Sequence, residues 1–147
     1  MSQIPARSLA ALLGMKPKKA ESFTALDLSR EVGRGLPAAA VDLVCAKIAP
    51  GDLRLRHRIV PKATLARRQR ATQRRLSPEE SNRLARLAQL WAFAIEVWRS
   101  EPAAQRFLAE PHPLLRGRIP RELAIESEIG ARAVEELLGG LKYGNAV

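Results

Sequence analysis

The spacing of apolar residues along the chain is that of amphipathic helices. Apolar side chains recur at steps of three and four positions, and they do not alternate with polar ones as in a half-buried strand. The clearest stripe contains six residues: Leu84, Leu87, Ala88, Trp91, Ile95 and Trp98. A stripe of this kind is typical of a helix face that packs against a core. We therefore expect an all-α fold.

Helix starts can be read in the first third of the chain. A short helix is expected around residues 8–13. Thr24 and Asp27 are three positions apart and suit a capping box for the next helix. Pro37 suits the first position of a third helix, because that position needs no backbone N–H.

Two further short helices are expected to follow, joined by a tight turn. Asp52 can cap a helix over residues 53–59, and Pro61 precedes another over residues 62–72, in which Leu65 faces inward. Two short helices with Arg covering the second are typical of a helix-turn-helix DNA-binding unit.

The second half of the chain begins with a strong helix signal. Residues 77–80 read Ser-Pro-Glu-Glu, which supplies a cap, a proline at the first helical position and an acid at the third. Shorter helices are expected from Ser100, Pro120 and Ser127. The glycine pair at residues 139–140 is expected to end the last of them and leave a short tail.

Positive charge is concentrated in residues 54–75, which hold nine Arg and Lys and no Asp or Glu. The rest of the chain is nearly neutral, so this segment accounts for almost all of the formal net charge of +10. A solvated surface is the ordinary explanation of a charge cluster. An acid-free run on a helix after a turn favours binding to phosphates instead. The expected DNA contacts are Lys62, Thr64, Arg67, Arg68 and Arg70.

The sequence gives little support for a catalytic site or a metal-binding site. Cys45 is the only cysteine, which excludes an internal disulfide and fits a reducing compartment. His57 and His112 are isolated, and no glycine-rich phosphate loop occurs. No apolar run is long enough to span a membrane. We expect a cytoplasmic protein that is not an enzyme and needs no cofactor or metal.

Residues 61–90 read PKATLARRQRATQRRLSPEESNRLARLAQL and resemble the junction of the Xre/MbcA/ParS-type antitoxins. In that family a TLxRR recognition helix leads into an LSPEES start of the toxin-binding domain. Residues 127–138, SEIGARAVEELL, resemble its TExGAxxVxxLL segment. Residues 107–120 resemble its WL..PNPxLGGxxP segment, with Phe107 in place of Trp, His112 in place of Asn and Arg116 in place of the first Gly. The resemblance covers roughly residues 22–147.

The resemblance implies a division of labour along the chain. Residues 1–21 precede the resemblance and are expected to be a flexible leader. Residues 22–75 would be an Xre-like DNA-binding domain, and residues 76–147 a helical toxin-binding domain. Antitoxins of this type accompany a RES-domain toxin that consumes NAD, and they repress their own operon. The extreme C-terminus would block the toxin's NAD pocket through Lys142, Tyr143, Gly144, Asn145, Ala146 and Val147.

Alternatives remain at three points. One short recognition helix reads few base pairs, so specific repression implies a homodimer on a two-fold operator, inside a larger complex with toxin. A stand-alone regulator whose second half only dimerises would show the same pattern, as would a non-specific nucleic-acid-coating protein.

The C-terminal tail could instead be frayed and have no function. Trp91 and Trp98 are expected in the core, with a partner interface as the alternative.

Overall fold

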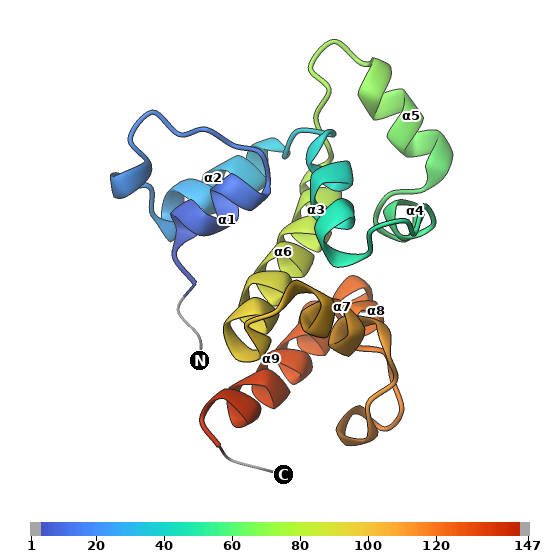
Figure 1. Ribbon diagram of the computed structural model, residues 1–147. Helices are drawn as coiled ribbons and strands as arrows, with labels where there is room; N and C mark the ends of the chain where they lie inside the picture. The colour runs from blue at the N-terminus through green and yellow to red at the C-terminus, as the bar shows by residue number, and fades with distance from the viewer. Residues whose placement is uncertain (1–3, 145–147) are drawn as a thin grey trace.

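Helix α6, Pro78–Trp98, is the longest helix of the protein and lies at its centre (Figure 1). The computed structural model describes residues 4–144. Seven other helices pack their backbones near α6: α1 (Ala6–Leu12), α2 (Ala25–Arg34), α3 (Ala40–Ile48), α4 (Leu55–Ile59), α7 (Glu101–Ala109), α8 (Pro120–Glu126) and α9 (Glu128–Lys142). Helix α5 (Lys62–Arg70) and two single turns, Ala20–Ser22 and Pro113–Leu115, complete the described part. No strand occurs in it, which confirms the all-α fold.

Two of the expected helix starts are capping boxes in the structure. At the start of α6, the Glu80 N–H donates to Ser77 Oγ at 3.1 Å, and the Ser77 N–H donates to Glu80 Oε1 at 2.9 Å. Thr24 and Asp27 exchange the same pair of bonds before α2. These local bonds satisfy N–H groups that a helix start leaves unpaired, which is why both starts could be predicted.

The core forms around α6 on more than one of its faces. Leu84, Leu87, Ala88 and Trp91 are buried as expected, but Leu90, Phe93 and Ala94 on other faces are buried as well. Trp98 is 39 % exposed, so its assignment to the core is wrong. It lies in the last turn of α6, beyond the enclosed part, and its ring lies 5.8 Å from that of Phe107.

The N-terminal segment contributes to this core. Helix α1 falls within the residues expected to form a flexible leader, yet Leu9, Ala10 and Leu13 are buried. The helix contacts α2, α3 and α6. Its apolar side chains are therefore part of the packing that surrounds α6.

Pro37 does not begin a helix, contrary to the prediction. It pairs with Arg75 in an isolated antiparallel bridge. The Ala38 N–H donates to the Arg74 carbonyl and the Leu76 N–H donates to the Leu36 carbonyl, both at 2.8 Å. These long-range bonds occupy the backbone next to Pro37, so α3 begins only at Ala40.

Two other helix boundaries also differ from the prediction. Helix α4 begins at Leu55, because Asp52 accepts a hydrogen bond from the Arg54 N–H at 2.9 Å and forms a turn before the helix. Helix α9 does not stop at the glycine pair but continues to Lys142. There the Lys142 ammonium lies 2.9 Å from Glu96 on α6, so a tertiary ion pair holds the last turn in helical form.

Gly35, at the end of α2, provides a test of the backbone bridge. Its φ is +99°, and an added Cβ would lie 2.2 Å from the Leu76 carbonyl oxygen. We expect Gly35→Ala to lower the free energy of unfolding by about 3 kcal/mol, from strain and lost pairing. Gly33→Ala is the matched control, since a Cβ there meets nothing within 4 Å. It should raise stability by about 0.5–1 kcal/mol. Urea unfolding followed by circular dichroism measures both, and equal effects would contradict the prediction.

Candidate nucleic-acid interface and C-terminal surface

Helices α4 and α5 form the pair expected of a helix-turn-helix unit. Leu55, Ile59, Val60 and Leu65 are all buried, so the turn and one side of each helix pack inward. Helix α5 lies at the edge of the molecule, away from the centre of α6 (Figure 1). One side of α5 is therefore left open to a partner.

The nine cations of residues 54–75 divide into two sets. Four have partners in the fold: Arg56 pairs with Asp42, Arg58 with Glu122, Arg68 with Glu80, and Arg75 donates to the Gly35 carbonyl. The other five are exposed and make no ion pair or side-chain hydrogen bond with residues 4–144: Arg54, Lys62, Arg67, Arg70 and Arg74. The second set is available to bind phosphates.

The unpaired cations of α5 lie opposite its buried side. Ala63, Arg67 and Arg70 follow one another at steps of four and three, which places them on one helix face. Leu65 lies on the other face and is 3 % exposed. Lys62 is exposed at the start of the helix, and Thr64 is half-buried beside it. Four of the five expected DNA contacts thus lie on or beside the open side of α5.

Arg68 is placed differently from the other expected contacts. Its Nε and Nη2 donate to the two carboxylate oxygens of Glu80, each at 3.2 Å. Burial acts to raise the pKa of Glu80, but hydrogen bonds from Arg68 and Ser77 outweigh it, so the pKa of Glu80 is lowered. The guanidinium is therefore held against α6. Sequence reasoning identified Glu80 as a cap but missed it as a partner of α5, because no local pattern signals a pair twelve residues apart.

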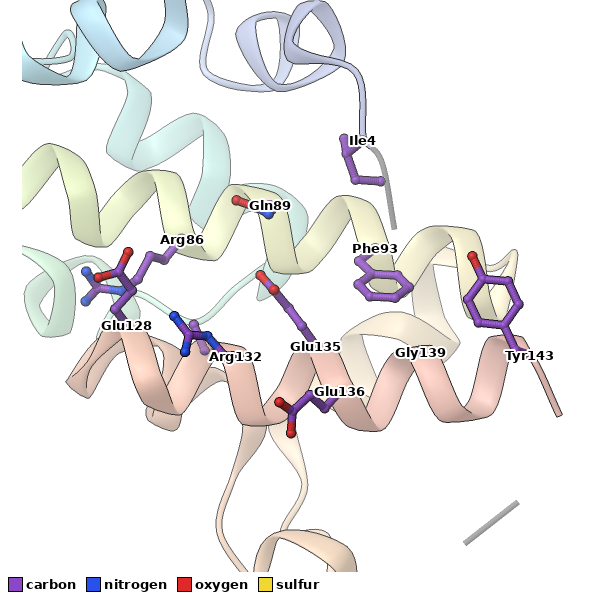
Figure 2. A pocket seen from close by; sticks show the side chains of 11 residues that line it. Ile4, Arg86, Gln89, Phe93, Glu128, Arg132, Glu135, Glu136, Gly139 and Tyr143 are labelled. Atoms are coloured by element: carbon purple, nitrogen blue, oxygen red, sulfur yellow. The ribbon is translucent and has the colours of Figure 1, made fainter. Parts of the chain in front are cut away.

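A groove of about 780 Å³ lies between α6 and α9 (Figure 2). Arg86 lines one end, and Phe93 and Tyr143 line the other. The Arg86 guanidinium donates to the carbonyls of Ala124 and Ile125 at 2.9 and 3.1 Å, which ties the end of α8 to α6. Burial lowers the pKa of Arg86, and burial raises the pKa of Glu135 inside the groove.

The expected C-terminal contact residues begin at the end of α9. Lys142 is paired with Glu96, and its ammonium lies 5.5 Å from the centre of the Tyr143 ring. Tyr143 is 59 % exposed, and Gly144 has a φ of +72°. Asn145, Ala146 and Val147 lie outside the described residues. The structure therefore presents the start of the expected contact segment on the surface, next to the end of α6.

The loop between α7 and α8 accommodates two of the departures from the family pattern, His112 and Arg116. His112 Nδ1 accepts a hydrogen bond from the Leu114 N–H at 3.1 Å, the kind of bond that an Asn side chain makes in such a turn. Arg116 adopts a left-handed conformation with φ 56°, at the position of the family's first glycine. The backbone here has the form that glycine favours, although glycine is absent.

Residues 4–144 contain neither a cluster of metal ligands nor a membrane-spanning helix. No group of three or more His, Cys, Asp or Glu side chains in this range is placed to hold a metal ion. None of the helices in it combines the length and the apolar character needed to cross a membrane.

Comparison with known families gives two matches that together cover most of the chain. The antitoxin Xre-like helix-turn-helix domain matches residues 27–89. The antitoxin Xre/MbcA/ParS C-terminal toxin-binding domain matches residues 93–144. A search of curated proteins gives no match. The first matched region contains the open face of α5, and the second contains Phe93, Glu135 and Tyr143 of the groove.

The lowered pKa of Glu80 predicts a pH-dependent contribution to stability. This contribution is present above the ordinary glutamate pKa of about 4.3 and is lost as the pH falls through the lower folded value. We expect Glu80→Gln to reduce the free energy of unfolding by about 2 kcal/mol at pH 7 and by less at pH 3. Glu79→Gln is the control, because its side chain is 85 % exposed. Urea unfolding at both pH values measures the difference in free energy of unfolding between each variant and the wild type. A difference for Glu80→Gln that is as large at pH 3 as at pH 7 would refute the prediction.

Proposed function

The chain belongs to the Xre/MbcA/ParS-type antitoxins, and on that basis we propose that it neutralises a RES-domain toxin that consumes NAD and represses its own operon. Its role as an antitoxin with a helix-turn-helix DNA-binding unit follows from the two family matches. The identity of the toxin and the autorepression are our proposal. The observation that supports repression most directly is the set of five exposed, unpaired cations on and beside α5.

In the proposed DNA complex, α5 enters the major groove with its open face toward the bases. Arg67 and Arg70 project from that face, and Arg suits bidentate contact with guanine O6 and N7. Lys62, Arg54 and Arg74 flank the helix and suit phosphates on either side. One such helix reads only a few base pairs, so the repressing species is a homodimer on a two-fold operator.

In the proposed toxin complex, the segment from Lys142 to the C-terminus blocks the NAD pocket. Two features support this role for the segment. The toxin-binding match extends to residue 144, and Tyr143 is exposed at the end of α9. An exposed phenol followed by a short peptide with a terminal carboxylate suits a nucleotide pocket, where ring stacking and a charged group are both recognised.

We expect the double substitution Arg67→Ala and Arg70→Ala to weaken promoter binding about a hundredfold at moderate salt. The preference for own-promoter over random DNA should fall as well, because the proposed contacts of these two side chains are with bases and not with phosphates. Fluorescence anisotropy with an own-promoter fragment and with random DNA measures both quantities.

Its control removes two exposed cations from the toxin-binding region, Arg116→Ala with Arg132→Ala, and should leave promoter affinity nearly unchanged. An equal loss in the control would show that only net charge matters. Equal affinity of the wild-type protein for random DNA would favour the nucleic-acid-coating alternative.

Truncation of residues 143–147 should abolish inhibition of the toxin while promoter affinity stays as in the full chain. Helix α9 and the Lys142–Glu96 pair remain in the truncated protein, so the fold should persist. NAD consumption by the toxin from the adjacent gene, with full-length or truncated protein added, measures the effect. Full inhibition of the toxin by the truncated protein would contradict the proposed blocking role of the tail. Absence of any such partner for the full-length protein would favour a stand-alone regulator.

A further inference from the structure

Helix α5 is connected to the rest of the protein by few interactions. It packs against α4, and Leu65 is its only buried residue. Beyond this contact, the ion pair of Arg68 with Glu80 is the side-chain bond that joins α5 to the body within residues 4–144. A helix held by one apolar anchor can rotate about that anchor, so a second attachment is needed to fix its direction.

The first turns of α6 provide that attachment, together with two others. Ser81 Oγ accepts from the Leu36 N–H at 2.8 Å, ahead of α3. Arg83 Nη1 donates to the Ile59 carbonyl at 2.6 Å, at the turn between α4 and α5. Glu80 binds Arg68 on α5 itself. The start of α6 thus binds the DNA-binding unit at three points. The capping box of α6 stabilises the helical turn that carries these side chains.

The geometry of the Arg68–Glu80 pair suits a positioning role. Two parallel N–H···O bonds fix the orientation of the guanidinium as well as its distance, which a single contact would not do. The Glu80 side chain is 12 % exposed and that of Arg68 is 28 % exposed, so solvent competes weakly. The pair is therefore maintained in the free protein, before DNA is present.

We propose that Glu80 and Arg68 are positioning residues for DNA binding: their ion pair sets the angle of α5, and Arg68 contacts no phosphate. This inference rests on the proposed promoter binding. It assigns Arg68 a different role from Arg67 and Arg70, although all three belong to one basic run. It also assigns an acidic residue a favourable role in binding a polyanion.

Glu80→Gln separates this role from general electrostatics. The substitution keeps an acceptor for the Ser77 N–H but removes the charge and the paired hydrogen bonds to Arg68. Loss of a negative charge near DNA should by itself tighten binding. The positioning role predicts the opposite, a loss of about tenfold in promoter affinity, with an unchanged salt dependence. The control Glu79→Gln removes the same charge one residue away and should bind as well as wild type or more tightly.

Arg68 is tested in the same anisotropy assay. Arg68→Ala should weaken promoter binding without lowering the salt dependence, whereas Lys62→Ala, which removes a proposed phosphate contact, should lower it by about one. The double variant Arg68→Ala with Glu80→Gln should bind no more weakly than the weaker single variant. Arg68→Lys keeps the charge but loses the paired bonds, so it should behave like Arg68→Ala. Circular dichroism selects a temperature at which every variant is folded.

Two results would overturn the proposal. One is binding by Glu80→Gln that equals or exceeds that of Glu79→Gln. The other is a fall in salt dependence for Arg68→Ala as large as that for Lys62→Ala. Failure of the wild-type protein to bind its promoter is a separate outcome, which overturns the promoter-binding proposal itself.

Discussion

The burial of α6 is the constraint on which the rest of the structure depends. A helix with apolar residues on several faces has to be enclosed, and no single neighbour can do this. Helices from the DNA-binding match and from the toxin-binding match therefore pack on the same rod, and their buried side chains form one continuous core. The limit between the two matches falls inside α6, between residues 89 and 93. The two functions are consequently built on one shared helix.

Features of the fold that depend on neighbours in sequence could be predicted, and those that depend on distant residues could not. The boxes at Thr24 and Ser77 use side chains three positions apart, so the sequence alone locates them. Pro37 and the glycines at 139–140 carry strong local preferences, but tertiary bonds override them. Trp98 is apolar and in register, yet it lies where α6 leaves the enclosed region.

The same distinction applies to the candidate DNA-binding site. Concentration of charge in one segment could be recognised directly, because charge is a property of composition. Which cations are free depends on acids far away in sequence, such as Asp42 for Arg56 and Glu122 for Arg58. Only the folded arrangement shows that the acid-free run is partly neutralised from outside. The exposed face of α5 is what remains after that neutralisation.

Because Gly139 and Gly140 are helical, the end of α9 spans less distance than an extended chain of the same residues would. Each glycine inside a helix costs roughly 1 kcal/mol relative to Ala, so the last turn of α9 is intrinsically weak. A helical residue advances the chain by about 1.5 Å and an extended one by about 3.3 Å. Unwinding residues 139–142 would therefore lengthen the connection to Tyr143 by about 7 Å, at the cost of the Lys142–Glu96 pair. The two glycines make such a lengthening less costly than it would be in a helix without them.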